Sequence, residues 1–395
     1  MVCEQKPKSE EYFHFPYLDK MLIDDDSCGQ FTYPVPQGKW LERFEKIAHC
    51  PIKKLIRLPP LMVSLGINDS CNYRCIHCFT RNSRKKLISQ LKKEDAIALI
   101  DNIVEFGVNS LRFFGMGEET IHPSFFEIAA YAKKKGLNTY LLTNGSQIYG
   151  NEDKFFNSFN AIRISFDAGD KEYYNYVHGF ETNSKCFQNV VKGISKLCEI
   201  KGNKLNPDFL IGTSFVITNL TPTEQIKKYI QLMKNLKVDF IRFKIDNTYQ
   251  LEQKKLKNFE RIINECKKKF GLNSDFVINF SSKKSDGIKT NYEKKLKLGC
   301  LTQFCRTNID AEGNVWSCNR SVIKEGHMNK GYLFGNIKEK KFSEIWLGEK
   351  RKKYIHDKIE QGSVPCDGCL NKQLKKAGNI LINISEEKIE NEKHN

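Results

Sequence analysis

Residues 64–79 read SLGINDSCNYRCIHCF, which places Cys71, Cys75 and Cys78 in C-x₃-C-x₂-C spacing. The apolar run Leu61–Leu65 just before them predicts a buried strand, so the cysteines fall in the loop that follows it. Three thiolates so close in sequence can ligate a 4Fe–4S cluster and leave one iron without a protein ligand, open to a small molecule. Structural zinc needs four ligands, and His77 lies between two cysteines, where simultaneous ligation is awkward.

Outward from this loop, short apolar runs alternate with amphipathic helical stretches. The predicted strands are Leu61–Leu65, Ser110–Phe114, Thr139–Leu142, Ala161–Phe166, Phe209–Ile217 and Phe240–Lys244. The predicted helices between and after them include Lys93–Phe106, Phe125–Lys135, Ser184–Cys198 and Leu251–Phe270. This alternation predicts an α/β chain, an open or partial (β/α)6 TIM-like barrel whose chemistry lies in loops after the strands.

The rest of the chain divides by composition. Residues 60–285 are predicted to form the barrel, and residues 1–59 an N-terminal extension of unknown role. The stretch 273–299 is polar and lysine-rich, which is typical of a linker. Residues 295–380 are turn-rich and cysteine-rich, which predicts a small second domain, and residues 381–395 are expected to be a flexible tail.

The cysteine loop after a first strand resembles that of the radical S-adenosylmethionine (SAM) superfamily. The resemblance implies a partial barrel of the radical SAM type, in which SAM chelates the open iron of the cluster. One electron then cleaves SAM, and the resulting 5′-deoxyadenosyl radical abstracts a hydrogen atom from a substrate C–H bond. His77 holds the position that is usually aromatic in the family and lies near the adenine.

Further SAM-binding candidates follow from the same resemblance. Gly117 and Glu118 match the family's Gly-Gly-Glu-Pro turn after the second strand, while Met116 and Glu119 depart from it by replacing Gly and Pro. A glycine permits close backbone approach, and a carboxylate can accept from the SAM ammonium.

The third and fourth strands end in two more family-like turns. Asn144 lies in Thr-Asn-Gly, near the expected SAM ribose, and Ser165 begins a Ser-x-Asp end that Asp167 completes. Ser165 could bond a ribose hydroxyl. His178 precedes a glycine and could position substrate or pack the loop; no catalytic residue is assigned.

A second group of cysteines lies near the C-terminus: Cys305, Cys318, Cys366 and Cys369. The segment from Cys305 to Cys318 predicts a β-hairpin that brings two thiols to one end. The group resembles the SPASM domain, or its shortened twitch form, and implies a second, auxiliary 4Fe–4S cluster with four cysteine ligands. A zinc ribbon is the alternative, and Cys300 could replace Cys305.

The resemblance favours oxidation or epimerisation of a sugar, cyclitol or similar small metabolite, with electrons from an external donor such as flavodoxin or ferredoxin. Maturation of a ribosomally made peptide, by cross-linking or epimerisation, is the alternative. A non-enzymatic zinc protein that binds nucleic acid is a remote third possibility.

Composition bears on these alternatives. The chain has 395 residues and a net charge of +17, but its basic clusters are scattered and lack interleaved aromatics, which disfavours nucleic acid. The sequence has no apolar run of about 18 residues, so it predicts no membrane span. The N-terminus lacks the apolar core of a signal peptide, so we expect a cytoplasmic protein with reduced thiols.

Overall fold

In a computed structural model of the chain, the described residues are 43, 46, 52–78, 80, 88–204, 206, 208–245, 251–270, 277–279, 302–317 and 333–360. Their strands form one sheet. The strands are β1 (Met62–Leu65), β2 (Ser110–Phe113), β3 (Asn138–Thr143), β4 (Ala161–Ser165), β5 (Leu210–Ile217), β6 (Phe240–Ile245), β7 (Val277–Asn279), β8 (Arg306–Ile309), β9 (Asn314–Trp316) and β10 (Leu333–Asn336). Their order across the sheet is β10-β9-β8-β1-β2-β3-β4-β5-β6-β7.

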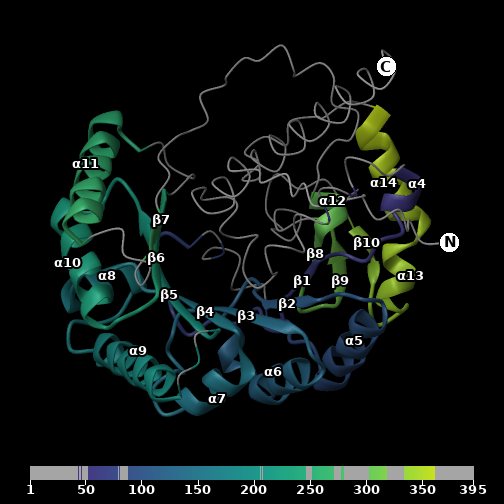
Figure 1. Cartoon of the computed structure of the whole chain (residues 1–395), viewed down its shortest axis with the longest axis horizontal. Helices are drawn as coiled ribbons and strands as arrows, with labels where there is room; N and C mark the ends of the chain where they lie inside the picture. The colour runs from purple at the N-terminus through teal and green to yellow at the C-terminus, as the bar shows by residue number, and fades with distance from the viewer. Residues whose placement is uncertain are drawn as a thin grey trace, which may run out of the picture.

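In this spatial order, β8 and the strands β1 to β7 all run parallel to one another. The sheet curves into an open arc with helices on its outer side (Figure 1). The outer helices are α5 (Lys93–Glu105), α6 (Phe125–Lys134), α7 (Glu152–Ser158), α9 (Cys186–Asn203), α10 (Thr223–Asn235) and α11 (Gln253–Phe270). A shorter helix, α8 (Lys171–His178), follows β4, and the 3₁₀ turn η1 (Glu119–Ile121) follows β2. This is the expected partial barrel of the radical SAM type, and it confirms the six predicted strands.

The core lies between the sheet and these outer helices. Alternate strand residues, such as Leu111 and Phe113 on β2, pack against apolar positions of α5 and α6, including Ile100 and Ile128. Since side chains alternate across a strand, the residues between them face the concave side of the arc. Buried polar side chains are concentrated on that side, among them Arg112.

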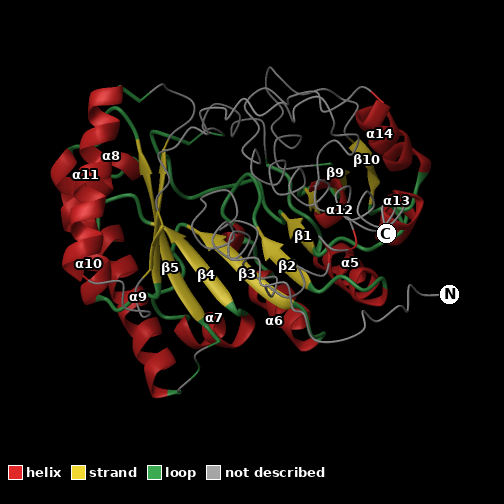
Figure 2. Ribbon diagram, turned by 45° about the horizontal axis from the view of Figure 1, so that its top comes forward, coloured by secondary structure: helices red, strands yellow, loops and turns green. Residues whose placement is uncertain are grey.

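The C-terminal elements are continuous with the barrel sheet. β8 pairs with β1 in parallel, and β9 and β10 extend the sheet in antiparallel fashion. Helix α12 (Thr302–Cys305) contacts β8, and helices α13 (Phe342–Trp346) and α14 (Glu349–Glu360) contact β10 (Figure 2). The Trp346 indole N–H donates to the Leu58 carbonyl at 2.8 Å, which ties this segment to the start of the barrel.

Two details differ from the sequence-based expectation. The stretch interpreted as a linker contains β7, which pairs with β6, because a three-residue strand is too short to produce a recognisable period. The predicted hairpin after Cys305 is present as β8 and β9, and its pairing with β1, which the sequence did not indicate, makes it part of the barrel sheet. Most of residues 1–59 and the tail 381–395 lie outside the described residues.

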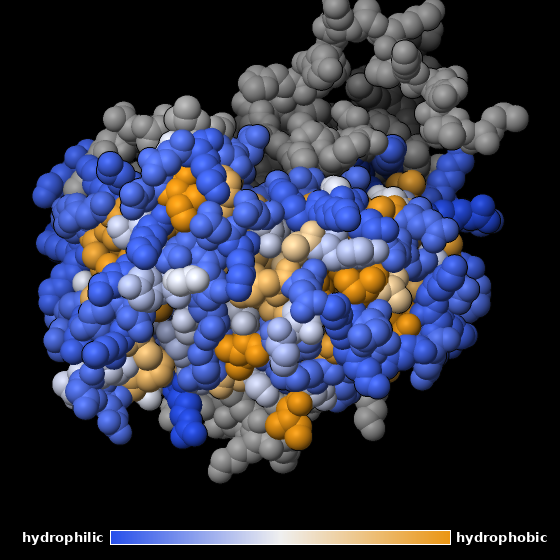
Figure 3. All heavy atoms as spheres, turned by 90° about the horizontal axis from the view of Figure 1, so that it is seen from below, coloured by the Kyte–Doolittle hydropathy of each residue, from blue (hydrophilic) through white to orange (hydrophobic). Residues whose placement is uncertain are grey.

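Within the described residues, no helix is long and apolar enough to cross a membrane. The outer helical surface is mainly hydrophilic, with small apolar patches (Figure 3). Large exposed apolar side chains in the described residues, such as Ile88, Tyr149 and Leu220, come from different parts of the chain.

Candidate functional site

The loop that carries the three cysteines lies against the end of α8. The Arg74 N–H donates to the His178 carbonyl at 3.1 Å, and the Ile76 N–H to the Val177 carbonyl at 2.9 Å. Cys71, Cys75 and Cys78 form no disulfide, and all three are partly exposed. The backbone of another segment therefore holds the loop at the carboxyl ends of the strands.

The turn after β2 packs directly on this loop and requires glycine at position 117. A Cβ atom on Gly117 would lie 2.2 Å from the Ser70 carbonyl oxygen and 2.6 Å from that of Asn68. The Glu118 N–H donates to the Ser70 carbonyl at 2.8 Å, and the Asn68 side-chain amide donates to the Glu118 carbonyl at 2.8 Å. The two residues that match the family turn thus bind the cysteine loop itself.

The Glu118 carboxylate joins this turn to the end of β3. Its Oε1 accepts from the hydroxyls of Thr120 and Thr143, both at 2.6 Å, and its Oε2 accepts from the Asn144 N–H at 2.7 Å. Burial raises the pKa of Glu118, and these hydrogen bonds oppose the rise. In this structure, the side chain orders two loops.

Asn144 brings the end of β3 to the first cysteine. Its side-chain amide donates to Asn72 Oδ1 at 2.8 Å and lies 4.0 Å from the Cys71 sulfur. Its Oδ1 accepts from the Ser146 N–H at 2.9 Å, which orders the turn after β3. The sequence-predicted Asn144 and Cys71 are therefore neighbours.

His178 contacts the second cysteine. Its Nδ1 lies 3.0 Å from the Cys75 sulfur, and its Nε2 lies 3.0 Å from the Phe166 carbonyl oxygen. Burial lowers the pKa of His178 to about 4, so the imidazole is neutral at pH 7. A carbonyl oxygen only accepts, so the single ring proton is on Nε2 and Nδ1 accepts from the Cys75 thiol.

His77 lies beside the end of β4. Its Nε2 is 3.3 Å from Asp167 Oδ2, and Asp167 Oδ1 accepts from the Val216 N–H at 2.7 Å. Burial favours a higher pKa for Asp167, but the interactions with His77, His178 and the Val216 N–H together outweigh burial and lower the pKa. Asp167 has a φ of 55°, an uncommon conformation for a residue other than glycine, and this turn carries its carboxylate.

Ser165 ends β4 in register with Ser214 of β5. It lies at the same edge of the sheet as the cysteine loop, since both follow the carboxyl ends of parallel strands. Among the described residues, Ser165 makes no hydrogen bond to that loop.

Comparison with known proteins agrees with this geometry. Residues 66–214 match the Radical SAM superfamily, and residues 300–370 match SPASM, the iron-sulfur cluster-binding domain. The chain contains a radical SAM domain followed by a SPASM domain. The two domains imply a 4Fe–4S cluster that binds SAM and auxiliary iron–sulfur ligation in the C-terminal domain.

Relatives of this radical SAM chain differ in what they act on. It is 25% identical over 305 residues to the Fe-coproporphyrin III synthase of Methanosarcina barkeri, covering 72% of this chain and 73% of that protein. It is 25% identical to the cysteine-type anaerobic sulfatase-maturating enzyme of Clostridium novyi, covering 76% and 83%. The fold is similar to that of Streptococcus suis SuiB bound to S-adenosylmethionine, with a TM-score of 0.58, 15% identity, and coverage of 84% and 72%.

The cysteine loop fits a radical SAM cluster in its donor set. The described residues contain no group of three His, Cys, Asp or Glu side chains that could hold a single metal ion. Three partly exposed cysteines on one loop provide the number of thiolate ligands that a 4Fe–4S cluster with one open iron needs. The close packing of Gly117 on the loop backbone supports this arrangement.

Of the four cysteines predicted to bind the auxiliary cluster, only Cys305 lies in the described residues. Cys305 lies at the junction of α12 and β8 and is fully buried. Cys318, Cys366, Cys369 and Cys300 lie outside the described residues. The four-cysteine auxiliary site therefore stays a prediction.

Two of the contacts around the loop could not be predicted from the sequence. Thr80 Oγ1 lies 3.1 Å from the Cys78 sulfur and donates to the Met116 carbonyl at 3.2 Å. Thr143 orients Glu118 from the neighbouring strand. Isolated threonines carry no recognisable pattern, so only spatial contact identifies them.

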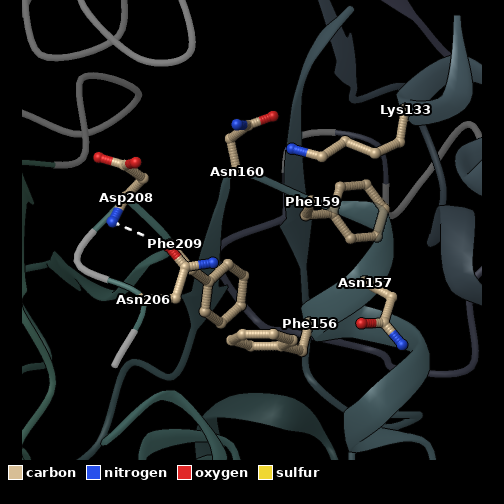
Figure 4. Close-up of a pocket in the computed structure, with 8 residues that line it drawn as sticks. All are labelled: Lys133, Phe156, Asn157, Phe159, Asn160, Asn206, Asp208 and Phe209. Atoms are coloured by element: carbon tan, nitrogen blue, oxygen red, sulfur yellow. Dashed lines mark hydrogen bonds between the residues drawn. The ribbon is translucent and has the colours of Figure 1, made fainter. Parts of the chain in front are cut away.

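A surface pocket of about 320 Å³ lies at the other end of the sheet, where β4 and β5 begin (Figure 4). Its lining comprises Lys133, Phe156, Asn157, Phe159, Asn160, Asn206, Asp208 and Phe209. Catalytic sites of such folds lie at the carboxyl ends of the strands, so this pocket is separate from the radical SAM site.

Proposed function

We propose that the protein uses SAM to abstract a hydrogen atom from a C–H bond of a small metabolite, which is thereby oxidised or epimerised. The contact of the cysteine loop with Gly117, Glu118 and Asn144 carries this proposal. Those contacts join the ends of β1, β2 and β3 into one polar rim.

In this proposal Cys71, Cys75 and Cys78 hold the SAM-binding cluster. When bound, the cluster supplies the electron that cleaves SAM to methionine and a 5′-deoxyadenosyl radical. Cys305, Cys318, Cys366 and Cys369 would hold the auxiliary cluster, which would accept one electron from the substrate radical and so complete its oxidation. A flavodoxin or ferredoxin would be the external donor, and the reducing cytoplasm would keep the thiols available.

The chain's own groups would orient SAM at this rim. We assign the SAM contacts to His77, Gly117, Glu118, Asn144 and Ser165. Glu118 would act through the turn it orders, because its carboxylate already accepts from three side-chain and backbone donors at 2.6–2.7 Å. Asp167 would orient His77 through their 3.3 Å contact.

Anaerobic reconstitution tests the cluster assignment. We expect about eight iron atoms per chain, and dithionite with SAM should yield 5′-deoxyadenosine. The variant with Cys71, Cys75 and Cys78 all replaced by alanine should lose about four iron atoms and all cleavage. Cys186→Ala with Cys198→Ala, on helix α9, is the matched control and should retain both. Cleavage by the triple variant would refute the proposal.

Maturation of a peptide is the second candidate, because a sulfatase-maturating enzyme is among the relatives that match most of the chain. Candidate substrates with deuterium at their C–H bonds distinguish the two proposed functions. Transfer of deuterium into 5′-deoxyadenosine from a small metabolite would support the first function, and transfer from a peptide the second.

A further inference from the structure

Arginines occupy the concave side of four strands. On β2, Leu111 and Phe113 belong to the core beneath the helices, and Arg112 between them faces the concave side. Three other strands each carry a buried arginine on the same side. They are Arg163 on β4, Arg242 on β6 and Arg306 on β8, and all four arginines are at most 4% exposed.

The strand register places these four arginines at one level. Arg306 is in register with Met62, and Met62 with Ser110, two residues before Arg112. The same two-residue shift leads from Arg112 to Arg163, and from Arg163 to Arg242. In a (β/α) barrel a shift of roughly one residue per strand keeps side chains level, and each interior layer comes from alternate strands. The four arginines therefore form one interior layer, the arginine layer.

Such layers in (β/α) barrels usually consist of bulky branched apolar side chains. Here burial, followed by the charges of Arg306, Arg163 and Arg242, lowers the pKa of Arg112 to about 9. The Arg112 guanidinium is thus close enough to the other three arginines to be repelled by them in a buried place. Gathering like charges there is unfavourable unless anions compensate them.

Neutral polar groups face the same space. Ser64 is in register with both Arg112 and Asn308. The Ser64 hydroxyl, the Asn308 side-chain amide nitrogen and Arg163 Nε are buried and have no hydrogen-bond partner in the structure. Within the described part of the chain, Arg163 also forms no ion pair. These three side chains therefore leave hydrogen-bonding groups unsatisfied inside the barrel, within the described residues.

The arginine layer lies directly beneath the candidate radical site. Each arginine is one to three residues before the end of its strand, and the cysteine loop follows β1 at that same end. A molecule that entered at the rim could place an anionic group in the layer and leave a C–H bond near SAM. Guanidinium groups bind carboxylate and phosphate oxygens in the same bidentate way.

We propose that the arginine layer is an anion-binding subsite that anchors a substrate bearing carboxylate or phosphate groups. This inference rests on the proposed function and specifies its substrate class. The anionic group of the substrate binds in the arginine layer, and the reacting carbon lies at the rim beside the cysteine loop.

Binding of two probe anions to the reconstituted holoenzyme at saturating SAM tests this subsite. Citrate represents carboxylates and tripolyphosphate represents phosphates, each titrated by calorimetry. We expect one of them to bind at one per chain, and Arg163→Gln to weaken that binding by about tenfold or more. Arg163→Lys should retain part of the affinity. Arg261→Gln is the control, since Arg261 pairs with Glu265 on the exposed face of α11.

Binding of citrate alone assigns carboxylates, and binding of tripolyphosphate alone assigns phosphates. Equal affinity in the wild type and Arg163→Gln, or competition of the anion with SAM, would overturn the inference. If Arg163→Gln does not fold, Arg242→Gln replaces it under the same criteria. SAM cleavage by the wild type is measured separately, so failure of the proposed function is distinguished from failure of this subsite.

Discussion

The two faces of the same parallel strands differ sharply. The convex face carries Leu111 and Phe113 on β2, which are fully buried against helices. The concave face carries Arg112 on that strand and a buried arginine on each of three others. The convex face supplies the hydrophobic free energy that maintains the sheet, whereas the concave face buries charge at a cost in stability. The comparison indicates that the interior is built for a ligand.

The largest expected effect tests the convex face. Phe113→Ala removes a ring that packs edge-on against Phe125 and Phe159, at centroid distances of 5.7 and 5.9 Å. We expect the free energy of unfolding to fall by about 3–5 kcal/mol in urea titrations followed by circular dichroism.

The matched change on the concave face should act in the opposite direction. Arg163→Met replaces one of four repelling buried charges by an apolar side chain of similar length. We expect the free energy of unfolding to rise by about 1–2 kcal/mol in the same titration. A larger loss for Arg163→Met than for Phe113→Ala would contradict the comparison.

The rim between the faces is tested by Gly117→Ala. The added methyl group would collide with backbone atoms of the cysteine loop, so the loop must shift. We expect loss of about four iron atoms per chain and of SAM cleavage, measured by iron analysis and chromatography of 5′-deoxyadenosine. Gly202→Ala is the control, since a Cβ there meets no atom within 4 Å. Full iron content in Gly117→Ala would exclude this role for the contact.

The smallest effect concerns Glu119, whose Oε2 accepts from the Ile67 N–H at 2.7 Å at the same rim. Burial raises the pKa of Glu119 well above 4.5, and the charges of Glu118 and Asp69 add to the rise. The folded state therefore holds a proton that the unfolded state loses, so stability should fall as pH rises above about 4.5 through the folded-state pKa.

Glu119→Gln should remove the contribution of Glu119 to that dependence, so the variant should gain stability relative to the wild type at pH 8 more than at pH 5, measured by urea titration at both values. Glu265→Gln, at an exposed position on α11, should show no such gain. An unchanged pH slope in Glu119→Gln would show that the carboxyl does not titrate differently on folding.

Much of the barrel could be predicted because its signals are local. The runs at β1 to β6 are short and rich in apolar and β-branched residues, as expected for parallel strands buried on both faces. The cysteine loop was recognisable from spacing alone. By contrast, β7 is three residues long, and the pairing of β8 with β1 joins segments far apart in sequence.

The site was predictable only in part for a similar reason. Gly117 and Glu118 could be found from a short motif, but their contacts with Ser70, Thr143 and Asn144 depend on how three loops meet. The contact between His178 and Cys75 depends on where α8 ends. Neither contact has a fixed spacing along the chain.

The sequence by itself determined the cluster-binding loop, the alternation of strands and helices, and the superfamily. Those features depend on spacing and periodicity within short segments. Only the tertiary structure placed Arg112, Arg163, Arg242 and Arg306 in one layer, because their common level follows from the strand register of the curved sheet. A residue's height in a barrel is a property of the whole sheet, so no single segment encodes it.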